Sequence, residues 1–276
     1  MSAVKTVMFL LGAAFIIWLL VQNWSVIVEY SQSIHVGWML FALLVGGLSN
    51  FLLAVFFSNI LKKHSTQSYL VKDGIRAYIN SQPVKYIPGK IWQFLFQSFY
   101  VSESHNKTRV FLVNIEFMLV LVAFVGGLSG CLLFYARDSF LFILSFISLI
   151  LVGAGYTFVS LRMSADIKTS WQLTLLALVA SAGYLTAIYF YFYAWDLSIA
   201  AGMTELVGLS GISWAAGILS FVFPAGLGVK EWVFIYLPSI INIDINYSLL
   251  VSYILFMRIW QIIYELVSVL VYRLFR

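Results

Sequence analysis

The sequence predicts an all-α integral membrane protein that forms a single transmembrane domain, with six full transmembrane helices and two broken-helix segments. The first observation is composition: 62% of the 276 residues are hydrophobic and 10% are charged, whereas a soluble domain has about 25% charged residues. The second observation is that the apolar residues form long unbroken runs. The strands of a membrane β-barrel would instead alternate between apolar and polar residues.

The full spans are predicted from apolar runs that each reach the roughly 20 residues a helix needs to cross the hydrocarbon core. These runs are 5–28, 36–60, 109–135, 139–161, 171–195 and 247–272. The first run resembles a signal peptide, but no small-x-small cleavage site follows it, so we expect an uncleaved helix.

Two stretches do not fit a simple span. The first, 61–108, contains YIPGKIWQ at 86–93, and the second, 198–246, contains FPAGLGVKEW at 223–232. Proline and glycine interrupt helices, so we expect a broken or re-entrant helix in each stretch.

Basic residues indicate the orientation of the chain, because cytoplasmic loops of membrane proteins are enriched in lysine and arginine. With the N-terminus inside, the cytoplasmic side receives Lys62, Lys63, Lys72, Arg76, Lys85, Lys90, Lys107, Arg109, Arg162, Lys168, Arg273 and Arg276. The opposite side then holds mostly acids, with Arg137 as its one base. We therefore expect a protein of the cytoplasmic (inner) membrane with both termini in the cytoplasm.

The halves 1–135 and 139–276 repeat one order of elements: two spans, a broken stretch and a third span. Because three crossings are an odd number, the second half must cross the membrane in the opposite direction, as in inverted-topology repeats. The two breaks would then enter from opposite sides. Each contains a proline, glycine and a lysine, with a tryptophan two residues after the lysine. The alternative is two unrelated helix breaks.

The first break places Pro88 and Gly89 directly before Lys90. A half-helix that starts here presents unpaired backbone N–H groups and a partial positive charge, which favour an anion. Lys90, Gln93 and Gln97 have the i, i+3, i+7 spacing of one helix face. The alternative is an amphipathic interfacial helix whose lysine lies among the lipid headgroups.

The second break is formed by Pro224, Gly226 and Gly228, which precede Lys230 and Glu231 in an apolar stretch. A charge at the centre of the bilayer costs about 2.5–3.5 kcal/mol on insertion scales. Such charges are therefore candidates for ligand binding, and the alternative is a structural ion pair.

The last span carries further polar residues on one helix face, because Arg258, Gln261 and Glu265 are three and seven residues apart. Intramembrane charges normally face the interior of a bundle and mark a substrate or ion path. The candidate substrate-binding residues are Lys90, Gln93, Glu116, Lys230, Glu231, Arg258, Gln261 and Glu265, with Glu205 as a further interior acid. The alternative is a set of ion pairs that lock the helices together.

Small residues recur in VGGLS at 45–49 and at 125–129 and in VGLSG at 207–211. They predict close helix packing, with a bent or mobile helix as the alternative. The single cysteine excludes an intramolecular disulfide. The three scattered histidines lack metal-ligand spacing, so we predict neither a metal nor a cofactor.

YIPGKIWQ, a glutamate-bearing span, FPAGLGVKEW and a final span with an arginine together resemble the flippase-like membrane domain of lysylphosphatidylglycerol synthases. They also resemble its stand-alone relatives found with bacterial and archaeal glycan genes. The resemblance covers about residues 5–272. Family members have P-G-G-L-G-x-R-E at the second motif, where this chain has Ala225 in place of a glycine and Lys230 in place of arginine.

The resemblance implies lipid translocation without aminoacyl transfer, since the transfer reaction belongs to a separate soluble domain. The first hypothesis is therefore a flippase or scramblase, not an enzyme, for an anionic lipid such as a phospholipid or a polyprenyl-phosphate-linked sugar. Its expected partners are the membrane, the lipid and glycosyltransferases of a glycan pathway, with no nucleic acid, and a homo-oligomer is compatible with the sequence. The alternatives are a membrane enzyme acting on lipid-linked phosphates and a non-catalytic scaffold of a glycan-assembly complex.

Overall fold

The computed structural model describes the chain apart from several short segments and most of the first 33 residues. The described residues are 18, 21, 22, 24, 25, 28, 34–65, 70–86, 91–101, 107–135, 137–164, 166–195, 202–220, 226, 228–243, 245 and 247–274. Within these residues every regular element is a helix and no strand occurs, which confirms the predicted all-α fold.

Five helices are long and apolar enough to cross a membrane. They are α3 (Val36–Lys63), α6 (Lys107–Phe134), α7 (Ser139–Ser164), α8 (Ile167–Tyr193) and α11 (Tyr247–Leu274). They confirm five of the six predicted spans, with ends shifted by a few residues. The remaining prediction, 5–28, lies mostly outside the described residues.

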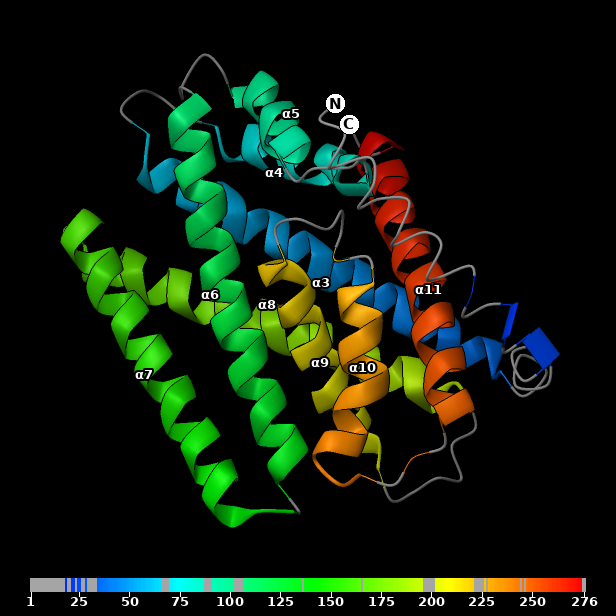
Figure 1. Ribbon diagram of the computed structural model, residues 1–276. Coiled ribbons are helices and arrows are strands. Elements are labelled where there is room, and N and C mark those ends of the chain that lie inside the picture. Colours follow the sequence, from blue (N-terminus) through cyan, green and yellow to red (C-terminus); the bar gives the residue numbers. More distant parts are fainter. Residues whose placement is uncertain are drawn as a thin grey trace, which may run out of the picture.

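The long helices enclose two short ones. In Figure 1, α6 and α7 lie side by side on one side of the molecule and α11 lies on the other, with α9 (Met203–Leu219) and α10 (Val229–Ile240) between them. Helix α7 is peripheral: 6% of its apolar window is buried, against 50% of that of α8. The apolar face of α7 is therefore available to lipid, and the interior is built around α8.

Helices α3 and α8 form an antiparallel pair across the molecule. At one end the His35 N–H donates to the Ala194 carbonyl (2.6 Å), and further along the Ser49 hydroxyl donates to the Ala180 carbonyl (3.0 Å). A Cβ on Gly183 would lie 3.5 Å from the Ser49 Cβ. Small residues therefore let these two backbones approach closely, as is typical of helix pairs in lipid.

The same explanation holds for the other small-residue clusters. Gly208 of α9 packs on α6, where an added Cβ would lie 2.6 Å from the Ser129 carbonyl oxygen. On α3, a Cβ on Gly46 would lie 3.3 Å from the rings of Trp260 and Tyr264 of α11. All three clusters thus contribute to helix contacts, which confirms the packing interpretation.

Each broken stretch folds into a pair of short helices. The first contains α4 (Val71–Ser81), a 3-10 turn η1 (Pro83–Tyr86) and α5 (Ile91–Val101), and we call it hairpin 1. The second contains α9 and α10, which we call hairpin 2. Neither hairpin contains a helix long enough to be a candidate span.

Hairpin 1 is antiparallel and opens toward the end of α11. The Arg76 guanidinium of α4 lies over the Tyr100 ring of α5, and the Gln97 amide donates to the Ser81 hydroxyl (2.9 Å). The start of α4 is held by the long helices, because the Tyr272 hydroxyl reaches the Lys72 carbonyl (3.5 Å). The end of α4 that continues into η1 therefore points inward.

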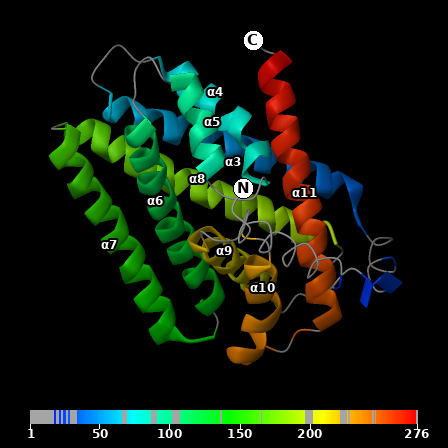
Figure 2. The same cartoon turned by 45° about the horizontal axis from the view of Figure 1, so that its top comes forward.

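Hairpin 2 opens at the opposite end. Arg137, in the turn between α6 and α7, donates to Glu205 at the start of α9 (3.0 Å) and to the Asn242 carbonyl after α10 (2.8 Å). One side chain thus holds both outer ends of the hairpin. Figures 1 and 2 show hairpin 1 at the end of the molecule where α11 finishes and hairpin 2 nearer the other end.

The turn of hairpin 2 requires glycine. Gly226 and Gly228 have φ values of 70° and 83°, in the left-handed region that disfavours other residues. A Cβ on Gly226 would also lie 2.7 Å from the Gly217 Cα. The structure thus places these two predicted break residues between α9 and α10, whereas Pro88, Gly89 and Pro224 lie outside the described residues.

The two hairpins make corresponding contacts. In the first half α4 packs on α3 and α5 packs on α6, and in the second half α9 packs on α8 and α10 packs on α11. Each hairpin therefore bridges the second and third spans of its own half, and the two enter from opposite ends. The predicted inverted repeat requires this correspondence.

Candidate functional site

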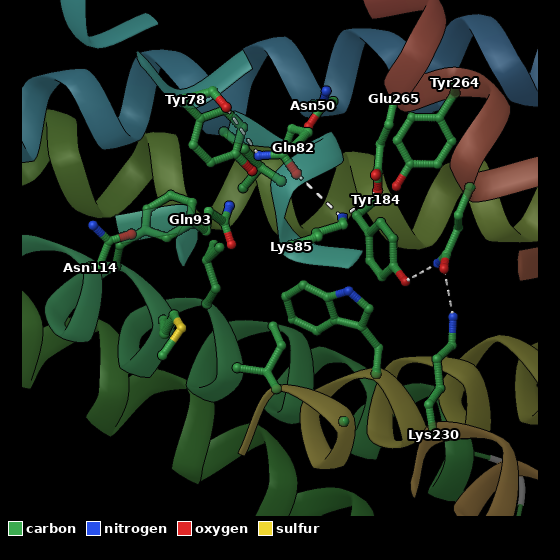
Figure 3. Close-up of a pocket in the computed structure, with 18 of the residues that line it drawn as sticks. Asn50, Tyr78, Gln82, Lys85, Gln93, Asn114, Tyr184, Lys230, Tyr264 and Glu265 are labelled. Atoms are coloured by element: carbon green, nitrogen blue, oxygen red, sulfur yellow. Dashed lines mark hydrogen bonds and ion pairs between the residues drawn. The ribbon is translucent and has the colours of Figure 1, made fainter. Parts of the chain in front are cut away.

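A polar cavity of about 150 Å³ lies where the two hairpins and four long helices meet (Figure 3). In the same measure a single water needs roughly 10–15 Å³, so the space accommodates several waters or a small charged group. Its polar lining consists of Asn50, Tyr78, Gln82, Lys85, Gln93, Gln97, Asn114, Tyr184, Lys230, Arg258, Gln261, Tyr264 and Glu265. Five of the eight predicted substrate-binding residues are among them.

The predicted polar face of α11 faces this cavity, and each of its residues meets a hairpin. Arg258 and Gln261 contact hairpin 2, and Glu265 contacts hairpin 1. The seven residues from Arg258 to Glu265 span about 10 Å at 1.5 Å per residue. The inner ends of the two hairpins therefore lie at successive levels along one helix face.

Glu231 is a structural acid at the start of α10. Its side chain is fully buried, one carboxylate oxygen accepts the Gly228 N–H (2.8 Å), and the other lies 3.2 Å from the Arg258 Nε. It caps the helix and neutralises the arginine at once. The structural ion pair weighed as the alternative for this motif is thus formed by Glu231, but with Arg258 and not with its neighbour Lys230.

Lys230 has a different environment. Its side chain is 3% exposed, and its Nζ donates to the Gln261 side-chain oxygen (2.9 Å), whose amide donates in turn to the Tyr184 hydroxyl (3.0 Å). Among the described residues no carboxylate lies within 4 Å of this ammonium group. Lys230 is thus a buried cation that is held by a neutral chain of hydrogen bonds.

Lys85 is a site residue that the sequence pattern does not reveal, because it stands among many bases of the predicted cytoplasmic stretch. In the structure it follows α4 in η1, and its Nζ lies 2.5 Å from Glu265 and 3.3 Å from the Gln82 side-chain oxygen. Glu265 itself is 4% exposed. The one available signal was position, since Lys85 lies five residues before Lys90 in the same break.

The charges around the cavity do not balance. Lys85, Lys230 and Arg258 supply three positive charges, and Glu231 and Glu265 supply two negative ones. For the part of the chain that is described, the difference in formal charge is plus one, and it falls on Lys230. A charge buried without a counter-ion is costly in a membrane interior, so an anion in the cavity would be stabilised.

Neutral polar groups line the other side of the cavity. The Asn114 amide of α6 donates to the Gln97 side-chain oxygen (2.7 Å), which orients the polar face of α5 that also carries Gln93 (Figure 3). The side-chain amide nitrogen of Asn50, a 5%-exposed residue of α3, has no hydrogen-bond partner among the described residues. These groups supply donors and acceptors beside the cations.

Two acids of the predicted interior set lie elsewhere, which corrects that part of the prediction. Glu116 accepts hydrogen bonds from Lys63 (2.9 Å) and Tyr156 (3.1 Å) and pairs with His64 (2.7 Å). Two residues advance a helix by about 200°, so Glu116 faces away from the cavity that Asn114 lines. Glu205 joins the Arg137 clamp at the outer end of hairpin 2. Lys90 lies outside the described residues.

Comparison with known proteins adds no relative. No family model matches the chain, and searches of the curated proteins and of the solved structures find no significant match.

Proposed function

We propose that this protein is a flippase or scramblase for an anionic, phosphate-bearing lipid. The observation that carries the proposal is Lys230, a buried lysine without a described carboxylate partner on a cavity between two oppositely entering hairpins. A phosphate group would supply the missing negative charge. The lipid class we favour is a phospholipid or a polyprenyl-phosphate-linked sugar, which the resemblance implies.

The helix directions support an anionic ligand. Helix α5 begins at the inner end of hairpin 1, and a helix N-terminus carries unpaired N–H groups and a partial positive charge. Helix α10 also begins at the inner end of its hairpin, but Glu231 already caps that end. In transporters with inverted repeats, discontinuous helices present such ends to anionic substrate groups near the bilayer midplane. The cavity accepts the headgroup phosphate, and the hydrocarbon tail stays in the lipid.

The distribution of charge supports the orientation. Bases lie at the end where α3, α7 and α11 finish and α6 and α8 begin: Lys62, Lys63, Lys107, Arg109, Arg162, Lys168 and Arg273. The opposite end carries the Arg137–Glu205 pair. By the positive-inside rule the first end is cytoplasmic. Hairpin 1 then enters from the cytoplasmic side of the inner membrane. Glycosyltransferases that build lipid-linked sugars would supply the substrate there.

The proposal is tested in liposomes with a fluorescent phosphate-bearing lipid. Wild-type protein should expose inner-leaflet probe to a membrane-impermeant reductant, and Lys230→Ala should slow that exposure about tenfold, as expected for the loss of a charged hydrogen bond. Lys168→Ala is the matched control, because it removes an exposed lysine in the first turn of α8.

Three results would contradict the proposal. If folded wild-type protein moves no anionic lipid, transport is excluded. If it converts a polyprenyl-phosphate substrate into a new product, the enzyme alternative replaces it. If Lys230→Ala lowers stability but leaves lipid transport and the amount of cell-surface glycan normal, Lys230 has only a structural role. That is the result that the scaffold alternative predicts.

A further inference from the structure

A second cavity, of about 300 Å³, lies at the outer end of hairpin 1. Its lining comes from three helices: Arg76 and Asn80 from α4, Tyr100 from α5, and Tyr272 and Arg273 from the last turn of α11. It therefore lies where a long apolar helix ends, at one surface of the membrane, and not in the hydrocarbon core.

The two arginines of this cavity lack acidic partners. Its lining contains two guanidinium groups and no carboxylate, and among the described residues neither Arg76 nor Arg273 forms an ion pair within 4 Å. The Arg76 guanidinium lies over the Tyr100 ring, 5.0 Å from its centre. A cation–π contact of this kind leaves the N–H groups of the guanidinium able to bind two oxygens of one phosphate.

An interfacial arginine needs no ligand when it stands alone, and Arg162 illustrates that case. It is exposed in the last turn of α7 and lies over the ring of Phe158 on its own helix, at 4.9 Å. Arg273 is exposed as well, but it lines one cavity together with the half-buried Arg76 of another helix, and like charges in one space repel each other. An anion between them would remove that repulsion.

Helix α4 separates this outer cavity from the central one. Arg76 and Asn80 line the outer cavity, whereas Tyr78 and Gln82 line the central cavity. Residues two apart on a helix point about 200° apart, so one short helix presents a polar face to each space. On α11, Tyr272 follows Glu265 by seven residues and lies on the same face about 10 Å further out.

We propose that the outer cavity binds a phosphate group, with Arg76 and Arg273 as its ligands and Asn80 and the two tyrosines as neutral hydrogen-bond partners. As an anion site it stands independently of transport. As a waiting site for a lipid headgroup on the way to Lys230 it rests on the proposed function. The same chemistry would bind a free phosphate, and the experiment separates these two sources.

Native mass spectrometry of the purified full chain in detergent measures binding of dioleoyl phosphatidic acid, with dioleoyl phosphatidylcholine as the zwitterionic reference. We expect the double variant Arg76→Gln/Arg273→Gln to bind phosphatidic acid about tenfold more weakly, because hydrogen bonds from a charged guanidinium to phosphate contribute strongly to affinity. The control Arg162→Gln should retain wild-type affinity. Competition with inorganic phosphate identifies the source: displacement indicates a site for the free ion, and no displacement indicates a site for the lipid headgroup.

An unchanged affinity of the double variant, or an equal loss in Arg162→Gln, would overturn the site and leave only general attraction of bases to anionic lipid. If the double variant does not fold, Arg76→Lys decides, because it keeps the charge and loses the planar fork. A reduced affinity of Arg76→Lys then supports the site, and an unchanged affinity overturns it.

The liposome assay keeps the two proposals apart. A protein that binds phosphatidic acid through Arg76 and Arg273 but moves no lipid refutes the proposed transport and leaves the site standing. A protein that transports lipid, with unaltered binding in the double variant, refutes the site alone.

Discussion

The pair formed by Arg258 and Glu231 should be the most costly interaction of the central site to break. At 3.2 Å, two unit charges in a medium of effective dielectric constant 20 attract by about 5 kcal/mol. Removal of one partner from a buried pair typically costs about 3–5 kcal/mol, because the remaining charge stays buried. Glu231 is fully buried, so Arg258→Met should lower the free energy of unfolding by about that amount.

A double-mutant cycle tests this magnitude. Glu231→Gln keeps an oxygen that can accept the Gly228 N–H and removes the charge, and it should restore part of the stability lost in Arg258→Met. The free energy of unfolding is measured by titration with sodium dodecyl sulfate in mixed micelles. We expect a coupling energy of about 2 kcal/mol between the two positions, while the exposed control Lys168→Met changes stability by less than about 0.5 kcal/mol. A coupling below about 0.5 kcal/mol would refute the pairing.

Three further predictions concern other residues of the fold and the site. Gly208→Val places a side chain against the α6 backbone and should cost about 1–3 kcal/mol. Gly126→Val, where an added Cβ would meet no atom of another helix within 4 Å, should cost nothing in the same titration. Arg137→Ala removes the clamp on hairpin 2 and should speed amide hydrogen exchange in the outer turns of α9 and α10. Equal acceleration in hairpin 1 would contradict that role. Tyr184→Phe removes the hydroxyl that Gln261 contacts and should cost about 0.5–1.5 kcal/mol, with slower lipid transport; unchanged transport would show that the chain ending at Tyr184 does not matter for the ligand.

The spans and the hairpin-2 break were predictable because their causes are local. An apolar run of sufficient length must form a helix in lipid, since no other conformation of a lone segment satisfies its backbone groups there. The ends of α3, α6, α7, α8 and α11 fall within a few residues of the predicted runs for this reason. The break at Gly226 and Gly228 could be predicted for a similar reason, because the positive φ values at this turn favour glycine.

The partners in the central site were not predictable, because they depend on which distant segments meet. Lys85 and Glu265 are 180 residues apart, and in a positive-inside pattern Lys85 cannot be told from the loop bases around it. The polar face of α11 could be derived from its spacing alone, but the hairpin that each of its residues meets could not. Glu116 is the opposite case. Its position along the span predicts that it faces the protein interior, but its partners depend on the rotation of α6 relative to α3 and α7, which the sequence does not give.

The three cations of the cavity differ in how readily a phosphate could replace their protein partners. Lys85 holds the Glu265 carboxylate and Arg258 holds Glu231, which the Gly228 N–H also fixes. Lys230 holds a neutral amide, and a charged–neutral hydrogen bond is weaker than an ion pair. In the proposed function a phosphate is therefore held most readily at Lys230, while both ion pairs still tie the hairpins to α11. A headgroup that comes from the outer cavity would pass Lys85 before it reaches Lys230, because Glu265 lies on α11 between Tyr272 and Gln261. In this proposal its phosphate competes with Glu265 for Lys85 and so weakens the hold of α11 on hairpin 1.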